Sequence, residues 1–231
     1  MMRTFTWRCV LTVAVLLVPV AARAQLPARA VLVAPEWFAG AAVGVTMSSS
    51  GDEFPGNPSI LRPEIGGTAL EAVFTAGAFV TPHVGFAGEF TVPRAFDVHQ
   101  TWGRDATTWD NEHRDLSLVG LVLVRTSVGR AQLAGAFGAG NVWSRTTTVR
   151  RSRRFGEPPT APPFGTGTST RHITDLALVA GAELNAPLAS RVSLVPYFRL
   201  LIVPRSADNS FEDQLPTYLY HVGIGLRLWF R

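Results

Sequence analysis

Apolar residues recur at every second position along most of this chain, and the positions between them are small, polar or charged. The pattern is clearest near the end, where one face of a segment consists of Tyr218, Tyr220, Val222, Ile224, Leu226, Leu228 and Phe230. The other face of that segment carries His221, Gly223, Gly225 and Arg227. A period of two residues indicates a β-strand with two unlike faces. We therefore expect an all-β protein.

Eight segments follow or continue this alternation, and turn-forming residues separate them. They span 36–48, 67–80, 84–97, 109–126, 131–148, 170–186, 191–204 and 217–230. Two stretches are less decisive, because 116–126 is apolar on both faces and 131–148 is small on both. The connections alternate in length, with short turns at 81–83, 127–130 and 187–190 and longer polar or proline-rich segments at 49–66, 98–108, 149–169 and 205–216.

The first 24 residues have the three parts of a secretory signal peptide. Arg3 and Arg8 make the start basic, residues 9–20 form an apolar run, and Ala22-Arg23-Ala24 is an Ala-x-Ala cleavage site. The apolar run is about a dozen residues long, which is short of the ~20 that a membrane-spanning helix needs. We expect export of the protein and cleavage after Ala24.

The composition is unusually poor in charge. Hydrophobic residues make up 47% of the chain and charged residues only 16%, a low share for a surface that faces water. All 21 basic residues are arginines, and the single cysteine, Cys9, lies in the expected signal, so no disulfide framework is available. Loss of the signal removes three arginines and no acid, which lowers the net charge from +4 to +1. A nearly neutral chain has no overall field to attract nucleic acid.

The apolar face of such strands meets either a protein core or lipid, and in a transmembrane β-barrel it is the lipid face. Short turns at one rim and long loops at the other are also typical of these barrels. The chain ends in Gly225-Leu226-Arg227-Leu228-Trp229-Phe230-Arg231, an alternation that leads to an aromatic residue. With these features the chain resembles the small eight-stranded outer-membrane barrels of Gram-negative bacteria, the type seen in the transmembrane part of outer membrane protein A.

The resemblance implies an eight-stranded antiparallel up-and-down transmembrane β-barrel at 36–231, with short periplasmic turns and long extracellular loops. A short periplasmic segment at 25–35 would precede it. The implied location is the bacterial outer membrane, and the implied partner during biogenesis is the barrel-assembly machinery. Gly225, Leu228 and Phe230 would form the signal that this machinery recognises. We expect a monomer.

Charged residues fall on the expected inner faces of the strands: Glu71, Glu89, Asp175, Glu183, Arg199 and Arg227. An arginine on the lipid face at mid-bilayer costs ~2–4 kcal/mol, whereas inside the barrel it can be paired. The interior of an eight-stranded barrel is narrow enough for side chains to fill it. We therefore expect a structural ionic cluster in preference to a proton or ion path, with the closing strand bringing Arg227 toward the side that carries Glu71.

The histidines are the main candidates for chemistry. His99, His113 and His172 lie toward the long-loop rim, where three rings could meet, but no cysteine or carboxylate at ligand spacing supports a metal site. Some eight-stranded outer-membrane barrels are lipid-modifying enzymes that combine histidine with serine and an acid. His113 has Glu112 and Asp115 near it, yet the chain has no Gly-x-Ser-x-Gly motif. We expect no catalytic residue, metal or cofactor.

One long loop is rich in arginine, with Arg150, Arg151, Arg153 and Arg154. A run of charges usually indicates a solvated surface. At the outer surface of this membrane it would also face the phosphates of lipopolysaccharide, which arginine binds bidentately. These four residues are therefore the candidates for contact with outer-membrane lipopolysaccharide.

Three functions follow from these expectations. The one we favour is a barrel with a structural or surface-interaction role and no enzymatic activity. The alternatives are an outer-membrane enzyme that modifies lipid A and a soluble exported barrel that binds a ligand inside, like a lipocalin. The soluble alternative would leave the apolar faces of six strands in water, which disfavours it.

Overall fold

The computed structural model describes residues 35–49, 66–93, 95–102, 107–152, 163, 165–204 and 218–230. Contacts group residues 34–231 as one compact unit, and the described residues of this unit form β-strands and the turns between them. They are β1 (Glu36–Ser49), β2 (Gly66–Phe79), β3 (Val84–Pro93), β4 (Phe96–Trp102), β5 (Thr107–Val128), β6 (Ala131–Ser152), β7 (Gly165–Ala189), β8 (Val192–Ile202) and β9 (Tyr218–Phe230). The expected signal peptide and most of the segment at 25–35 lie outside the described residues. Within those residues, no helix is long and apolar enough to span a bilayer.

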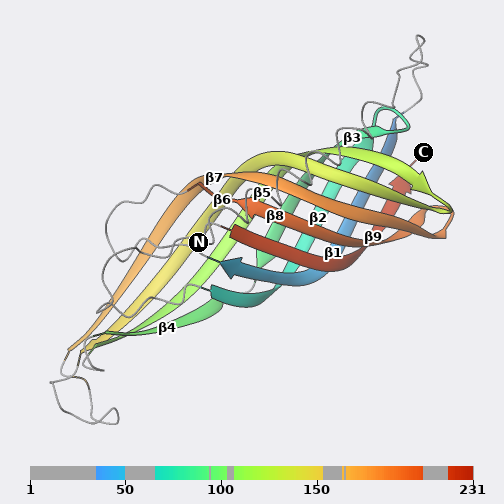
Figure 1. Cartoon of the computed structure of the whole chain (residues 1–231). Helices are drawn as coiled ribbons and strands as arrows, with labels where there is room; N and C mark the ends of the chain where they lie inside the picture. Colours follow the sequence, from blue (N-terminus) through green and yellow to red (C-terminus); the bar gives the residue numbers. More distant parts are fainter. Residues whose placement is uncertain are drawn as a thin grey trace, which may run out of the picture. The chain divides into compact units, whose positions relative to one another are not determined.

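The strands pair antiparallel in the order β3-β2-β1-β9-β8-β7-β6-β5-β4, and a further pairing of β3 with β5 closes the ring. β3 pairs with β5 from Val84 to Thr91, and β4 pairs with β5 from Phe96 to Trp102. The two therefore occupy one position in the barrel, separated just after Pro93, which has no N–H to donate to a partner strand. The expected closed barrel of eight antiparallel strands is confirmed (Figure 1).

Three strands are longer than the sequence pattern predicts. β5 and β6 have 22 residues each and β7 has 25, whereas the remaining strands have 7 to 14. In Figure 1 these three strands, green to orange, run together with β4 past the ends of the other strands. Parts of the predicted loops at 98–108 and 149–169 are therefore strand. The alternation did not predict these strand ends, because polar residues such as threonine and arginine occupy both of their faces. A strand is recognised from alternation only where one of its faces is apolar.

The two faces of the wall differ as predicted. Large apolar side chains such as Val43, Leu70, Phe74 and Ile224 are exposed on the outside. The positions between them are buried in the interior, including the two ambiguous stretches, where Leu123 and Ala136 point inward and Val122 and Phe137 point outward. A closed barrel with an apolar outer surface is the form in which strands span a bilayer.

Candidate functional site

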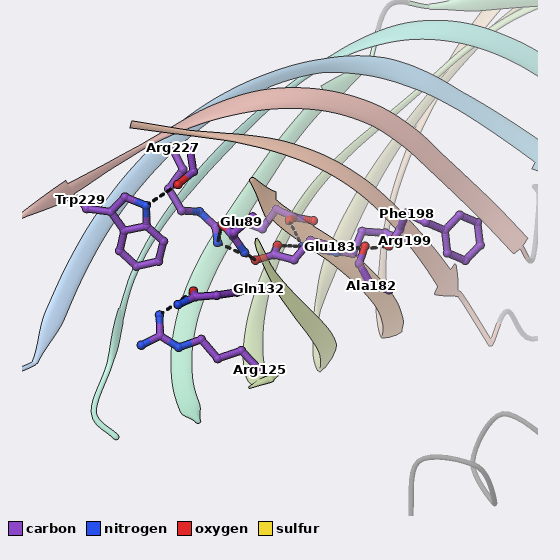
Figure 2. A network of polar contacts seen from close by, with 11 residues as sticks. Glu89, Arg125, Gln132, Ala182, Glu183, Phe198, Arg199, Arg227 and Trp229 are labelled. Carbon is purple, nitrogen blue, oxygen red and sulfur yellow. Dashed lines mark hydrogen bonds and ion pairs between the residues drawn. The ribbon is translucent and has the colours of Figure 1, made fainter. Parts of the chain in front are cut away.

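The interior holds an ionic network of charged side chains from several strands (Figure 2). The guanidinium of Arg199 on β8 lies 2.7 Å from the Glu183 carboxylate and 3.2 Å from the Glu89 carboxylate. Arg227 on β9 lies 2.6 Å from the second oxygen of Glu183 and donates a hydrogen bond of 2.9 Å to Asn185. We call Glu89, Glu183, Arg199 and Arg227 the ionic network. Two positive and two negative side chains, each at most 5% exposed, balance in charge.

The network connects strands on opposite sides of the closing seam. Its members come from β3, β7, β8 and β9. Arg199 and Arg227 lie on the paired strands β8 and β9 but are not opposite each other, and the carboxylate of Glu183 on β7 links them. Buried charges need this kind of multiple pairing, because each one loses several kcal/mol of hydration when it leaves water. The arrangement can hold these strands in register.

Glu71 belongs to a second cluster. Its carboxylate accepts a hydrogen bond of 2.6 Å from the hydroxyl of Tyr197 and lies 2.5 Å from Nδ1 of His221, while Thr46 donates to it as well. Arg227 does not reach Glu71, contrary to the expectation for the closing strand. The register explains the difference: Arg227 lies opposite Gly40, and Gly40 lies opposite Thr75, four residues along β2 from Glu71.

Two glycines make room for the tyrosine of this second cluster. Gly44 and Gly223 lie opposite each other on β1 and β9. A Cβ atom at Gly44 would lie 2.5 Å from the Tyr197 hydroxyl oxygen, and one at Gly223 would lie 2.6 Å from it. These separations are too short for any real side chain, so only glycine at both positions lets Tyr197 cross to Glu71. Sequence reasoning missed Tyr197, His221 and Thr46; their only signal was a polar group on an inner-face position.

Asp175, the remaining residue of the expected ionic group, is not a member of either cluster. It lies eight residues along β7 from Glu183 and opposite Val142 on β6. The inner face of β7 between them carries Ala177, Val179 and Gly181, of which the first two belong to a hydrophobic layer. This layer separates Asp175 from the ionic network.

A third cluster lies toward the long-strand rim. His113 Nε2 is 2.9 Å from one oxygen of Asp115, Ser144 donates a hydrogen bond of 2.5 Å to the other oxygen, and Thr146 lies 2.8 Å from His113 Nδ1. A catalytic triad needs the histidine between the hydroxyl and the acid, so that its ring takes the proton of the nucleophile. Here the acid lies between the other two, and the serine is bonded to the carboxylate. This geometry does not activate Ser144.

His113 and His172, two of the three histidines expected near the long-loop rim, lie on opposite faces of the wall. His113 is buried on the inner face of the wall, and His172 is exposed on the outer face. Glu112 also points outward, so only Asp115 of the two acids accompanies His113. The side chain of His99 lies outside the described residues. Among the side chains that the structure describes, no group of three or more histidine, cysteine, aspartate or glutamate residues could hold a metal ion.

Arg125 lies in the interior at the tight-turn end, where the alternation alone did not predict a functional residue. Its guanidinium stacks 3.7 Å from the centroid of Phe79. It donates hydrogen bonds of 2.8 Å to the Pro82 carbonyl and 3.2 Å to Gln132, and its ion pair with Glu36 is 2.7 Å long. The sequence did contain an indication of this position. Arg125 is a charged residue in the otherwise apolar segment 116–126, and its spacing of two and four residues places it on the same face as the inward Leu123 and Leu121.

The expected assembly signal lies on the closing strand. Leu228 and Phe230 are both about half exposed on the outer face, and Gly225 is on the inner face. Phe230 lies opposite Trp37, which is also exposed, so the two rings stand side by side at the tight-turn end of the apolar surface. Of the arginines expected to contact lipopolysaccharide, Arg150 and Arg151 belong to β6, where Arg151 pairs with Asp110. Arg153 and Arg154 lie outside the described residues.

Comparison with solved structures finds the same fold. Neisserial surface protein A aligns with a TM-score of 0.51 at 11% identity, over 84% of this chain and 97% of that protein. A major outer membrane protein from Thermus thermophilus aligns with a TM-score of 0.52 at 14% identity, over 83% of this chain and 99% of that protein. No protein-family model and no curated protein sequence matches the chain. The likeness is one of fold, and this fold with its apolar outer surface places the protein in the bacterial outer membrane.

Proposed function

We propose that this outer-membrane barrel has a structural and surface-interaction role without enzymatic activity. Its interior is plugged by the ionic network, and its long-strand rim contacts lipopolysaccharide. The observation that carries the proposal is the position of Glu183, whose two oxygens each bind a different arginine across the interior. A barrel of eight strands is narrow, and a network that spans it at this level leaves no wide path for solutes.

The long-strand rim supports a role at the cell surface. β5, β6 and β7 continue, together with β4, beyond the other strands and present threonines and arginines. Arg150 and Arg151 lie near the end of β6, and Arg153 and Arg154 follow them in the sequence. Guanidinium groups bind phosphates through two parallel hydrogen bonds, so an arginine-rich rim suits the phosphorylated surface of the outer leaflet.

The third cluster does not favour an enzyme that modifies lipid A. The Ser144 hydroxyl donates to Asp115, and the His113 ring bonds Thr146 through its other nitrogen. All of these groups are buried or half-buried inside the wall. A network of this kind stabilises the upper part of the barrel, whereas acyl transfer would need a hydroxyl that is both accessible and bonded to an imidazole.

Three measurements on the full-length protein test the proposal. Cell fractionation with carbonate extraction and a heat-modifiability gel should show a carbonate-resistant protein that migrates faster when it is not boiled. Proteoliposomes should show no swelling in an isosmotic monosaccharide. Mass spectrometry of lipid A should show the same species with wild-type protein, with the Ser144→Ala variant and with an empty vector.

Each measurement has an outcome that contradicts the proposal. Complete release by carbonate without detergent would show that the protein is not integral to the membrane. Rapid swelling would show an open pore and would overturn the plug. A lipid A mass shift that Ser144→Ala abolishes would establish the enzyme in place of the structural role.

A further inference from the structure

The outer face of the long strands carries a row of three basic side chains. Arg114 on β5 lies directly opposite Arg145 on β6, and Arg145 lies directly opposite His172 on β7. All three are exposed on the outer face. Residues directly opposite in an antiparallel pair have Cβ atoms about 4.5–5.5 Å apart, and like charges at this distance destabilise the sheet. We call Arg114, Arg145 and His172 the basic row.

The part of the chain that the structure describes does not neutralise the basic row. No ion pair forms to any of its three members among the described residues. Glu112 is on the same face but one row further out, opposite Thr147. The next acid on that face, Asp110, already pairs with Arg151. Among the described residues, two arginines in direct opposition are therefore without an acidic partner.

The height of the row on the wall indicates which anion this is. On β6 the exposed apolar side chains run from Leu133 to Trp143, and Arg145 is the next outward residue. Ten residues at ~3.3 Å each span about 33 Å along the strand. At the usual barrel tilt of ~40° they rise about 25 Å, which is the height of the apolar band of a transmembrane barrel. Arg145 thus follows the band directly, at the level of the lipid headgroups.

The inner face of the wall beside the basic row indicates the direction in which the row points. At the positions beside the row, Ser144 and His113 are buried on the inner face, whereas the members of the row are exposed on the outer face. The row therefore faces away from the barrel, beside the membrane, and not into a water-filled mouth. Trp143, two residues before Arg145 on the same face, provides the aromatic ring that usually marks the boundary between apolar chains and headgroups.

We propose that the basic row is a binding site for a phosphate group of lipid A in the outer leaflet. Two guanidinium groups clamp the phosphate through charge-assisted hydrogen bonds, His172 contributes a further donor, and the acyl chains lie along the apolar band below Trp143. The inference rests on the proposed function, because it needs the long-strand rim to face outward. It differs in assigning the contact to the wall at headgroup level and not to the arginines near the loop.

The test measures lipid A binding to the purified full-length barrel in detergent, by native mass spectrometry with a titration of bis-phosphorylated lipid A. The test variant is Arg114→Gln/Arg145→Gln. The matched control is Arg130→Gln/Arg191→Gln, which removes two exposed arginines from the turns at the opposite rim. A third variant, Arg150→Gln/Arg151→Gln, probes the loop end of β6. Every variant is first checked for the heat-modifiable band of the folded barrel.

We expect the test variant to bind lipid A at least tenfold more weakly than wild type, with the control unchanged and dephosphorylated lipid A bound weakly by all forms. Unchanged binding in the folded test variant would overturn the proposal. Equal affinity of the wild type for phosphatidylglycerol would overturn lipid A as the occupant. Loss of binding only in the Arg150→Gln/Arg151→Gln variant would overturn the basic row while leaving the proposed rim contact standing. Absence of binding in the wild type would contradict both.

Discussion

The hydroxyl of Tyr197 on β8 reaches past β9 and β1 to donate a hydrogen bond of 2.6 Å to Glu71 on β2. It does so because Gly223 and Gly44, on the two strands between, present no side chain to the interior. The bond crosses the seam at which the first and last strands of the barrel pair. It therefore joins the N-terminal and C-terminal parts of the wall through the interior.

Alanine at Gly44 should disrupt this crossing. The new Cβ would lie 2.5 Å from the Tyr197 hydroxyl and 2.6 Å from the Val222 carbonyl, so the tyrosine must move and the strands must shift. Overpacking of this kind costs about 1–3 kcal/mol. The free energy of unfolding in urea, measured on the refolded barrel, should fall by this amount.

Gly88→Ala is the matched control, because a Cβ atom at Gly88 meets nothing within 4 Å. We expect its unfolding midpoint to stay within the error of the wild type. Equal losses in the two variants would show that glycine is needed for strand formation in general and not for the passage of Tyr197.

Removal of one member of the ionic network should lower the free energy of unfolding strongly, because its partners then remain buried with less opposite charge beside them. Glu183→Ala leaves Arg199 and Arg227 without their common carboxylate, and breaking a buried pair typically costs about 3–5 kcal/mol. Arg199→Ala leaves Glu89 and Glu183 with less compensation. Both single variants should lower the unfolding midpoint in detergent.

The double variant Glu183→Ala/Arg199→Ala should be less harmful than the sum of the two single variants. Residues that share one network usually deviate from additivity by about 0.5–3 kcal/mol. Arg191→Ala, an exposed arginine in the neighbouring turn, serves as the control for loss of a charge. Strict additivity would mean that Glu183 and Arg199 do not interact.

Arg125 and Glu36 should contribute unequally to the stability of the barrel, although they pair with each other. Arg125 is 8% exposed, stacks on Phe79 and donates two further hydrogen bonds, to Pro82 and Gln132, so Arg125→Gln should lower the unfolding midpoint clearly. Glu36 is 29% exposed, and an ion pair on that side is worth about 0–1 kcal/mol. Glu36→Gln should therefore be nearly neutral. A larger loss from Glu36→Gln would show that the ion pair, and not the stacking, holds Arg125.

Replacement of Phe230 should impair assembly of the barrel in cells, whereas replacement of Trp229 should lower the stability of the folded protein. Phe230 is on the outer face and closes the expected assembly signal, so Phe230→Ala should reduce the amount of folded barrel that accumulates in cells. Trp229 packs against Phe38 and Phe79 and donates a hydrogen bond of 2.9 Å to Ser193, so Trp229→Ala should lower the stability of the refolded protein.

The two stages are separated by measuring both quantities for both variants. Phe230→Ala refolded in detergent should keep nearly the wild-type midpoint, because the side chain is half exposed on the outer face opposite Trp37. Equal accumulation of the two folded variants in cells would contradict the assignment of Phe230 to the signal.

Much of this architecture follows from the sequence alone, since a strand with lipid on one side and a packed interior on the other must alternate with period two. Val43 and Leu70 could be assigned to the outer face, and Glu71 and Arg227 to the inner face, from that alternation. The positions of the three tight turns follow from proline, glycine and serine between the alternating segments. The polar ends of β6 and β7 could not be assigned, because strands beyond the membrane need no apolar face.

Only the tertiary structure decided which inner-face residues meet. The partner of a side chain depends on the register of every strand and on the closure of the ring, and alternation contains neither. Arg227 therefore binds Glu183 on β7 and not Glu71, and Tyr197 crosses two glycines to reach Glu71. The pairing of Arg114 with Arg145 and of Arg145 with His172 likewise exists only because three strands are aligned at one row.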